Sequence, residues 1–213
     1  GGLIGIHGDK IGLRLPFEVS PIQIIIVPLY FTGQDLELLE KLCVDFASDL
    51  DKLGYRVKID DNREKKPKER FSFYEMKGVP VRIEVGPRDL EQGVVTIAKR
   101  NDGKKLAVRL DEITATIPSL LQTIHQEMYT AAKAHLDHHV TDIHTLEELD
   151  VALNQKLGYA KMMWCGNQAC EDAIKDRFNA TARVLPFDQS PFGEICPVCQ
   201  QKAHKVVVFA KAY

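Results

Sequence analysis

Residues 71–91 read FSFYEMKGVPVRIEVGPRDLE, and this stretch gives the first indication of the fold. Apolar residues alternate with polar or charged ones over 79–85, as in a strand with one apolar and one charged face. Arg82 and Glu84 fall on the charged face, which we expect to be exposed. The aromatic residues before them follow a helical pattern over 68–77, which a glycine then ends.

Strands and helices alternate on both sides of this stretch. Residues 22–27 are almost continuously apolar, which is typical of a strand buried on both faces. The short connections favour an α/β domain over 21–140, with a mixed five-stranded sheet and helices on both faces. We expect strands at 22–27, 55–59, 79–85, 93–99 and 105–109 and helices at 36–50, 68–77 and 113–128.

The two ends of the chain differ from this middle part. Residues 1–20 are apolar and rich in glycine, and we expect two short strands joined by a turn. Because a lone hairpin is marginal in water, they are expected to be the edge of another domain's sheet. Residues 141–213 hold four of the five cysteines and end in a strand-like run at 205–211, so a small α+β domain is expected there.

The composition is that of an ordinary globular chain. Of 213 residues, 45% are hydrophobic and 27% are charged. Five cysteines suit a reducing compartment, so we expect the cytoplasm. The longest apolar stretch, 22–29, is interrupted by Gln23 and Pro28 and is far shorter than the ~20 residues that span a bilayer. No membrane partner is therefore expected.

Positive charge gathers in the middle of the chain. Residues 62–109 contain 13 Lys and Arg against 7 Asp and Glu, whereas the remainder contains 15 against 23. This block alone suits a polyanion. A solvated surface with additional lysines is the alternative.

Four cysteines indicate a metal site. Cys165 and Cys170 are separated by four residues, and Cys196 and Cys199 by two. Two such pairs can bind one ion tetrahedrally, and thiolates favour zinc. Since four protein ligands leave no open position, the zinc would be structural. Metal-free thiols and a redox pair at 196–199 are the alternatives.

The charged strand and the residues around it also suit recognition of unpaired bases. Arg82 and Glu84 are followed directly by a turn at 86–89, and Glu75 lies on the preceding helix. Guanine presents donors to a carboxylate and O6 and N7 acceptors to an arginine fork, and loops of single-stranded RNA expose these edges. From the pattern alone, a surface ladder of salt bridges is an equal alternative.

Three segments together resemble one family. They are GGLIGIHGDKIGLRLP at 1–16, GVPVRIEVGPRDLE at 78–91, and the four cysteines followed by VFAKAY at 208–213. The chain resembles, over essentially its whole length, the C-terminal part of class II prolyl-tRNA synthetases of the archaeal and eukaryotic type. The resemblance implies a remnant of the catalytic domain at 1–20, an anticodon-binding domain at 21–140 and a zinc-binding domain at 141–213.

The resemblance also implies roles for individual residues. The anticodon-binding domain would read the two guanines of the proline anticodon, while Lys104 would contact the backbone of the loop. Lysines 65, 66 and 68 would attract phosphates. The terminal Tyr213 would approach the active site of the parent enzyme. The implied anticodon-reading residues are Glu75, Arg82, Glu84, Arg88 and Asp89.

The catalytic motifs of the family are absent from the chain. The parent enzyme would be a homodimeric proline–tRNA ligase, and its ATP and Mg²⁺ would be bound by the missing catalytic domain. This chain alone is expected to bind tRNA-Pro and to be inactive. The alternatives are a free-standing RNA-binding zinc protein and a thiol oxidoreductase built on Cys196 and Cys199.

Overall fold

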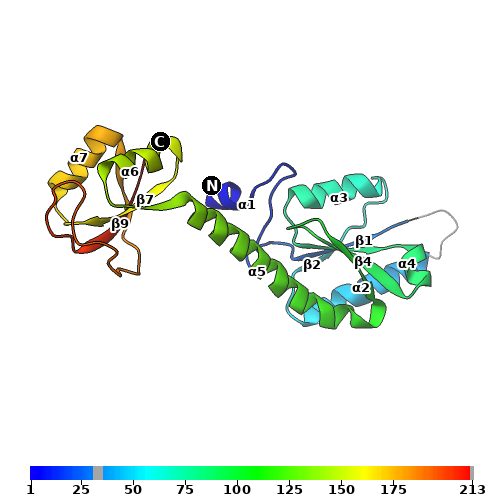
Figure 1. Ribbon diagram of the computed structural model, residues 1–213. Helices are drawn as coiled ribbons and strands as arrows, with labels where there is room; N and C mark the ends of the chain where they lie inside the picture. Colours follow the sequence, from blue (N-terminus) through cyan, green and yellow to red (C-terminus); the bar gives the residue numbers. More distant parts are fainter. Residues whose placement is uncertain (31–35, 212–213) are drawn as a thin grey trace. The chain divides into compact units, whose positions relative to one another are not determined.

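The computed structural model describes residues 1–30 and 36–211 (Figure 1). The chain divides into two compact units, Gly1–Ala132 and Lys133–Tyr213. Each unit has its own sheet and its own hydrophobic core.

The first unit contains a five-stranded mixed sheet with the order β2-β1-β3-β4-β5. β1 is parallel to β2 and to β3, whereas β4 is antiparallel to β3 and to β5. The predicted strand order along the chain and the mixed character of the sheet are confirmed. The strands are β1 (Ile24–Pro28), β2 (Val57–Ile59), β3 (Val81–Val85), β4 (Val94–Lys99) and β5 (Lys105–Arg109).

Helices cover both faces of this sheet, as predicted (Figure 1). On one face, α2 (Leu36–Lys52) and α5 (Ile113–His139) bury their apolar stripes against β1, β3 and β4. On the other face, Tyr74 of α3 (Pro67–Met76) packs with Ile25 and Val27 of β1. Because α3 lies over this face, the alternate residues of β1 and β3 are buried there too.

Two helices of the first unit, one short and one long, differ from what the sequence pattern predicts. The residues after β3 form α4 (Pro87–Glu91), which a proline begins because its fixed φ suits the first helical turn. A 3₁₀ turn (Leu110–Glu112) leads into α5, whose start at Ile113 places Pro118 inside the helix. Within residues 1–30 and 36–211, no helix combines the length and the apolar character needed to cross a membrane.

The expectation of two strands in residues 1–20 is wrong. The segment begins with α1 (Gly2–His7), which buries none of its side chains, and then forms one isolated bridge between Gly8 and Leu13. The backbone N–H of Leu13 donates to Met76 O at 3.0 Å, and that of Leu15 donates to Gly78 O at 3.2 Å. These two N–H groups thus pair with carbonyls at the end of α3, whereas the N–H of Arg14 pairs within the segment, with His7 O at 2.9 Å.

The second unit is a small α+β fold with a four-stranded mixed sheet of order β6-β7-β9-β8. β6 is parallel to β7, and β9 is antiparallel to both β7 and β8. A capping box at Thr145 begins α6, which continues into a π-helical turn (Val151–Gln155). The elements are β6 (Val140–Ile143), α6 (Leu146–Asp150), β7 (Tyr159–Trp164), α7 (Gln168–Phe178), β8 (Ala180–Val184) and β9 (Lys205–Lys211).

Candidate nucleic-acid interface and metal centre

Arg82 and Glu84 lie on the face of β3 that α3 covers. The expectation that this face is exposed is wrong, because Arg82 is only 7% exposed and Glu84 only 5%. A buried charge is tolerated when it is paired and hydrogen-bonded.

The guanidinium of Arg82 bridges two carboxylates. Its Nη1 donates to Glu75 Oε1 at 2.7 Å, while its Nε and Nη2 donate to Glu84 Oε1 at 3.0 and 2.9 Å. Lys105 donates to the second oxygen of Glu84 at 2.8 Å. The ring of Phe71 lies 4.1 Å from the guanidinium carbon, close enough for a cation–π contact. The charges are thus balanced within one cluster.

This cluster borders a pocket of about 310 Å³ in the first unit. Its walls come from β1, α3, β3, β4, β5, the turn between β4 and β5, and the N-terminal segment. The side chain of Glu75 is 33% exposed and that of Lys105 is 49% exposed, so both reach solvent. The residues that line this pocket include Asp9, Ile11, Glu75, Arg82, Arg100 and Lys105.

The structure brings three of the six predicted RNA-binding residues together. Glu75, Arg82 and Glu84 form the cluster just described. The described lining of the pocket does not include Arg88, Asp89 or Lys104. Arg88 and Asp89 lie on α4, where Arg88 is exposed and Asp89 accepts a hydrogen bond from Thr96. Lys104 lies on the β4–β5 turn, and its side chain is 78% exposed.

Several charged residues of the site are not evident from sequence patterns. Lys99 donates to Glu127 at 2.7 and 3.0 Å, although the two lie 28 positions apart in the sequence. Arg100 pairs with Asp9 across 91 positions. The only sequence signal for Lys99 and Arg100 is their place near the end of the predicted strand at 93–99, and that signal does not identify their partners.

A second buried pair lies at the beginning of α3. The Nε of Arg70 donates to Asp60 Oδ2 at 2.8 Å, and its Nη1 donates to Pro28 O at 2.8 Å. The side chains are 2% and 7% exposed. Because Arg70 fastens α3 to the end of β1, this pair stabilises the helix that carries Glu75.

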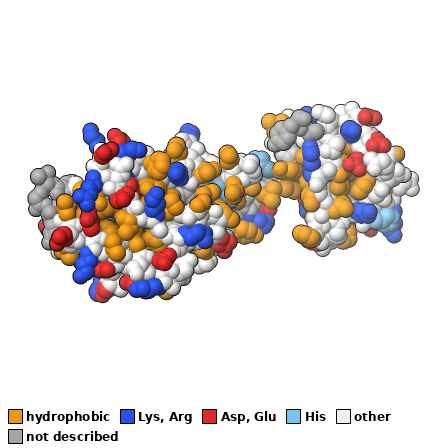
Figure 2. Space-filling model, turned by 180° about the vertical axis from the view of Figure 1, so that it is seen from behind, with side chains coloured by type: hydrophobic (Ala, Val, Ile, Leu, Met, Phe, Trp, Pro, Cys, Tyr) orange, Lys and Arg blue, Asp and Glu red, His pale blue; other side chains and the backbone are white. Residues whose placement is uncertain are grey.

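The three lysines at 65, 66 and 68 are exposed at the start of α3. On the face drawn in Figure 2, Lys and Arg side chains are interspersed with Asp and Glu. Exposed lysine side chains can pair with anions, and salt screens such pairs.

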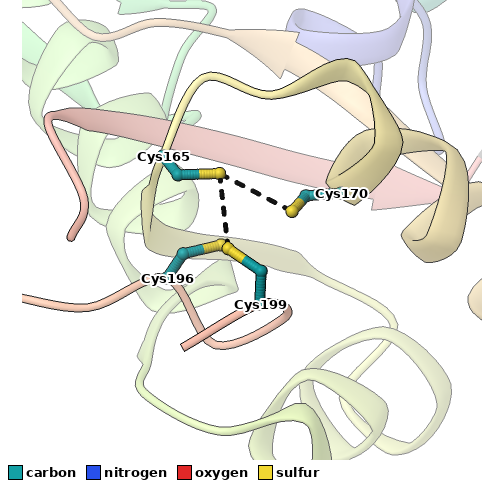
Figure 3. Close-up of side chains that lie close together, drawn as sticks. All are labelled: Cys165, Cys170, Cys196 and Cys199. Atoms are coloured by element: carbon teal, nitrogen blue, oxygen red, sulfur yellow. Dashed lines mark hydrogen bonds between the residues drawn. The ribbon is translucent and has the colours of Figure 1, made fainter. Parts of the chain in front are cut away.

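The four predicted metal ligands lie together in the second unit (Figure 3). Cys165 follows β7, Cys170 lies in the first turn of α7, and Cys196 and Cys199 lie on one tight loop before β9. All four sulfurs are within 4.8 Å of one another, and Cys165 Sγ is 3.6 Å from the sulfurs of both Cys170 and Cys199. A zinc–sulfur distance of ~2.3 Å in a tetrahedron separates the sulfurs by ~3.8 Å, so the cluster fits such an ion.

The backbone supports this cluster by donating to sulfur. The N–H of Gln201 lowers the pKa of Cys199, which favours the thiolate that metals bind. Burial raises the pKa of the Cys170 thiol, as expected for a buried sulfur. The structure describes all five cysteines, and each is a free thiol. Cys43 lies apart in the core of the first unit, where burial raises its pKa to about 12.

Two family models match the chain. Residues 23–120 match the model described as "Anticodon binding domain". Residues 146–213 match the model described as "Prolyl-tRNA synthetase, C-terminal". The matches fall on the first and second units, respectively.

Curated relatives carry the name "Proline--tRNA ligase". The proteins of Lachnoclostridium phytofermentans and Acetoanaerobium sticklandii are each 40% identical to this chain and match 100% of it. The chain spans only 43% and 44% of their respective lengths. It is therefore similar to part of each relative.

Solved structures show the same likeness. Prolyl-tRNA synthetase from Cryptosporidium parvum, complexed with L-proline and AMP, has a TM-score of 0.91 and 33% identity. The match covers 99% of this chain and 44% of that one. The same protein complexed with halofuginone and AMPPNP gives a TM-score of 0.90.

Proposed function

We propose that this chain, the C-terminal anticodon-binding portion of a prolyl-tRNA synthetase, reads the anticodon of tRNA-Pro with its first unit and holds a structural zinc ion in its second. The observation that carries the proposal is the Glu75–Arg82–Glu84 cluster beside an open pocket. Its donors and acceptors are those that the edges of guanine require.

Each member of the cluster has a chemical role in this reading. The carboxylate of Glu75 accepts from the N1–H and N2–H₂ groups of a guanine, and Arg82 donates to O6 or N7. In the chain without RNA, these two side chains hold each other at 2.7 Å, which keeps both in place for a base. Glu84, which accepts from the guanidinium of Arg82, and Phe71, whose ring lies against it, hold this guanidinium in its orientation.

The remaining predicted residues act at the edge of the loop. Arg88 and Asp89 on α4 contact the neighbouring nucleotides, and Lys104 contacts the phosphate backbone. The exposure of Arg88 and Lys104 and the position of all three residues on α4 and the β4–β5 turn support this assignment. The lysines at 65, 66 and 68 add attraction that does not depend on sequence.

The full protein of which this chain is part ligates proline to tRNA-Pro at the expense of ATP. The name shared by the relatives supports this, as does the Cryptosporidium structure with L-proline and AMP. ATP and Mg²⁺ bind to the catalytic domain outside this chain. The enzyme is a cytoplasmic homodimer of the archaeal and eukaryotic type. The part of it described by this chain is inactive by itself. The likeness over the whole chain to such ligases does not favour a free-standing RNA-binding zinc protein.

Zinc is the ion that best suits the sulfur cluster. Four thiolates favour zinc over magnesium or calcium, and four protein ligands leave no position for substrate. When bound, the ion joins β7, α7 and the loop before β9, so its role is structural. The convergence of both cysteine pairs on one point speaks against a separate redox pair at Cys196 and Cys199.

We place the anticodon-binding domain at 21–140 and the zinc-binding domain at 141–213, with 1–20 as the end of the catalytic domain. The family matches, which end at 120 and begin at 146, leave room for this boundary. The compact units meet at 132–133, inside α5. Tyr213, proposed to approach the active site of the parent enzyme, lies outside the described residues.

Binding of this chain to labelled anticodon stem-loops tests the proposal. Replacing either anticodon guanine of the proline stem-loop with adenine should weaken binding about tenfold or more, because a good bidentate base contact is worth ~1–3 kcal/mol. A stem-loop with inverted stem base pairs is the control and should bind nearly as the original does. Equal binding of all loops would overturn the base-reading role.

A further inference from the structure

The N-terminal segment of the first unit forms part of the pocket wall. Asp9 and Ile11 line the same pocket as Glu75 and Arg82. These two residues precede the part of the chain that matches the anticodon-binding model, which begins at residue 23. The pocket is thus completed by a segment from outside the matched domain.

Asp9 holds this segment to the β4–β5 turn through Arg100. The two ends of the guanidinium donate to the two carboxylate oxygens at 2.9 and 2.8 Å. Such bidentate pairs fix direction as well as distance. The side chain of Arg100 is 6% exposed and that of Asp9 is 28% exposed, so water has little access to the contact. The Arg100 guanidinium also holds the pKa of Asp9 well below its usual range.

The third nitrogen of the Arg100 guanidinium contacts the backbone of α3, the helix that carries Glu75. This nitrogen, Nε, donates to the carbonyl oxygen of Glu75 at 2.7 Å. This carbonyl lies in the last turn of α3, and it also accepts from the backbone N–H of Gly78, just beyond the helix, at 3.1 Å. Arg100 therefore fixes the backbone of Glu75, while Arg82 fixes its carboxylate.

Close backbone contacts hold the same segment against α3. The carboxylate of Asp9 accepts from the N–H groups of Ile11 and Gly12 at 2.9 and 3.0 Å, which shapes a tight turn. Gly12 has φ of +152°, and a Cβ there would lie 2.4 Å from Met76 O. A side chain at this position would push the turn off the helix, so the approach requires glycine.

We propose that Arg100 is a positioning residue for base recognition: anchored by Asp9, it fixes the last turn of α3 and thereby aims Glu75 at the base. The proposal rests on the proposed function of the pocket. Neither Asp9 nor Arg100 needs to touch a base. Their contribution is to guanine discrimination, because a misdirected Glu75 still permits the phosphate contacts that bind any loop.

The test uses the full chain and the ratio of its affinities for the proline stem-loop and for a loop with one guanine replaced by adenine. Asp9→Asn keeps an acceptor for Ile11 and Gly12 but weakens the pair with Arg100. Arg100→Lys keeps the charge but loses the fork and the Nε donor. Each should lower the discrimination ratio about threefold or more, as expected for coupled neighbours.

Two controls separate positioning from stability. Arg109→Gln breaks an exposed pair with Asp111 on the same unit and should leave the ratio unchanged. Urea unfolding of each variant shows whether the fold is retained, and a purely structural defect would weaken all loops by the same factor. If the wild-type chain discriminates and both variants keep its ratio, the positioning role of Arg100 is wrong, whereas the proposed function stands. If the wild-type chain does not discriminate, the proposed function fails and takes this inference with it.

Discussion

Arg82, in the middle of β3, donates to Glu75, in the last turn of α3, across 2.7 Å. The arginine side chain is 8% exposed and the glutamate is 33% exposed. A ligand entering the pocket therefore meets the carboxylate first and the guanidinium behind it. The pair links the sheet to the helix that covers it, so the proposed base recognition and the packing of α3 depend on the same contact.

Arg82→Ala should reduce both stability and base discrimination. Removing one partner of a buried ion pair typically costs ~3–5 kcal/mol, because the remaining charge stays buried. Glu84 keeps Lys105 as a partner, so we expect a loss near the lower end. Urea unfolding measures the first effect and stem-loop titration the second. Lys104→Ala is the control: it should leave stability unchanged and weaken all loops alike. An Arg82→Ala chain with wild-type stability and discrimination would contradict the assignment.

Arg70→Ala should reduce stability without changing the discrimination ratio. Arg70 and Asp60 are more deeply buried than the Arg82 cluster, and they lie at the other end of α3. The expected loss is again ~3–5 kcal/mol in the free energy of unfolding. Denaturant titration measures it, and the ratio is compared under conditions where both proteins are folded. A changed ratio in the folded variant would mean that this pair also belongs to the reading site.

Replacing the lysines at 65, 66 and 68 with alanine should make binding less sensitive to salt. If each contacts one phosphate, the slope of log affinity against log salt should become shallower by about 2, since each single-stranded phosphate contributes ~0.7. The loss should be the same for proline and substituted stem-loops. Titrations at several salt concentrations measure the slope. An unchanged slope would place the phosphate path elsewhere on the unit.

Zinc removal should unfold the second unit and spare the first. We expect one zinc ion per chain on purification, and its loss on treatment with a chelator or with Cys199→Ser. Elemental analysis measures the metal, and limited proteolysis with mass spectrometry shows which unit becomes sensitive. Cys43→Ala is the matched control, because it removes a thiol from the other unit's core and should keep the metal. Full zinc content in Cys199→Ser would exclude this cysteine as a ligand.

Sequence patterns predicted the sheet of the first unit because its strands are strongly apolar and its connections are short. The buried run of β1 and the alternation in β3 each correspond to an observed strand. The clustering of the four cysteines was also predictable, because the spacing of the two pairs along the chain is typical of metal ligands.

Patterns local to the chain could not predict which faces are covered. The alternation in β3 suggests one solvated face, but α3 buries it, so Arg82 and Glu84 are internal. In residues 1–20, local composition favoured two strands, whereas the segment forms a short helix and one isolated bridge and donates to carbonyls at the end of α3. The Asp9–Arg100 pair joins residues 91 positions apart, and no pattern in a single sequence reports such a contact.

The most direct test of the account measures the coupling between Glu75 and a guanine. Wild-type chain and Glu75→Gln are each titrated with the proline stem-loop and with a loop carrying inosine, which lacks the N2 amino group, at one anticodon guanine. If Glu75 accepts from that group, inosine should cost wild type ~1 kcal/mol or more and cost Glu75→Gln much less. If inosine costs both proteins the same at either position, Glu75 does not accept from the amino group of an anticodon guanine, which contradicts the proposed reading of guanine.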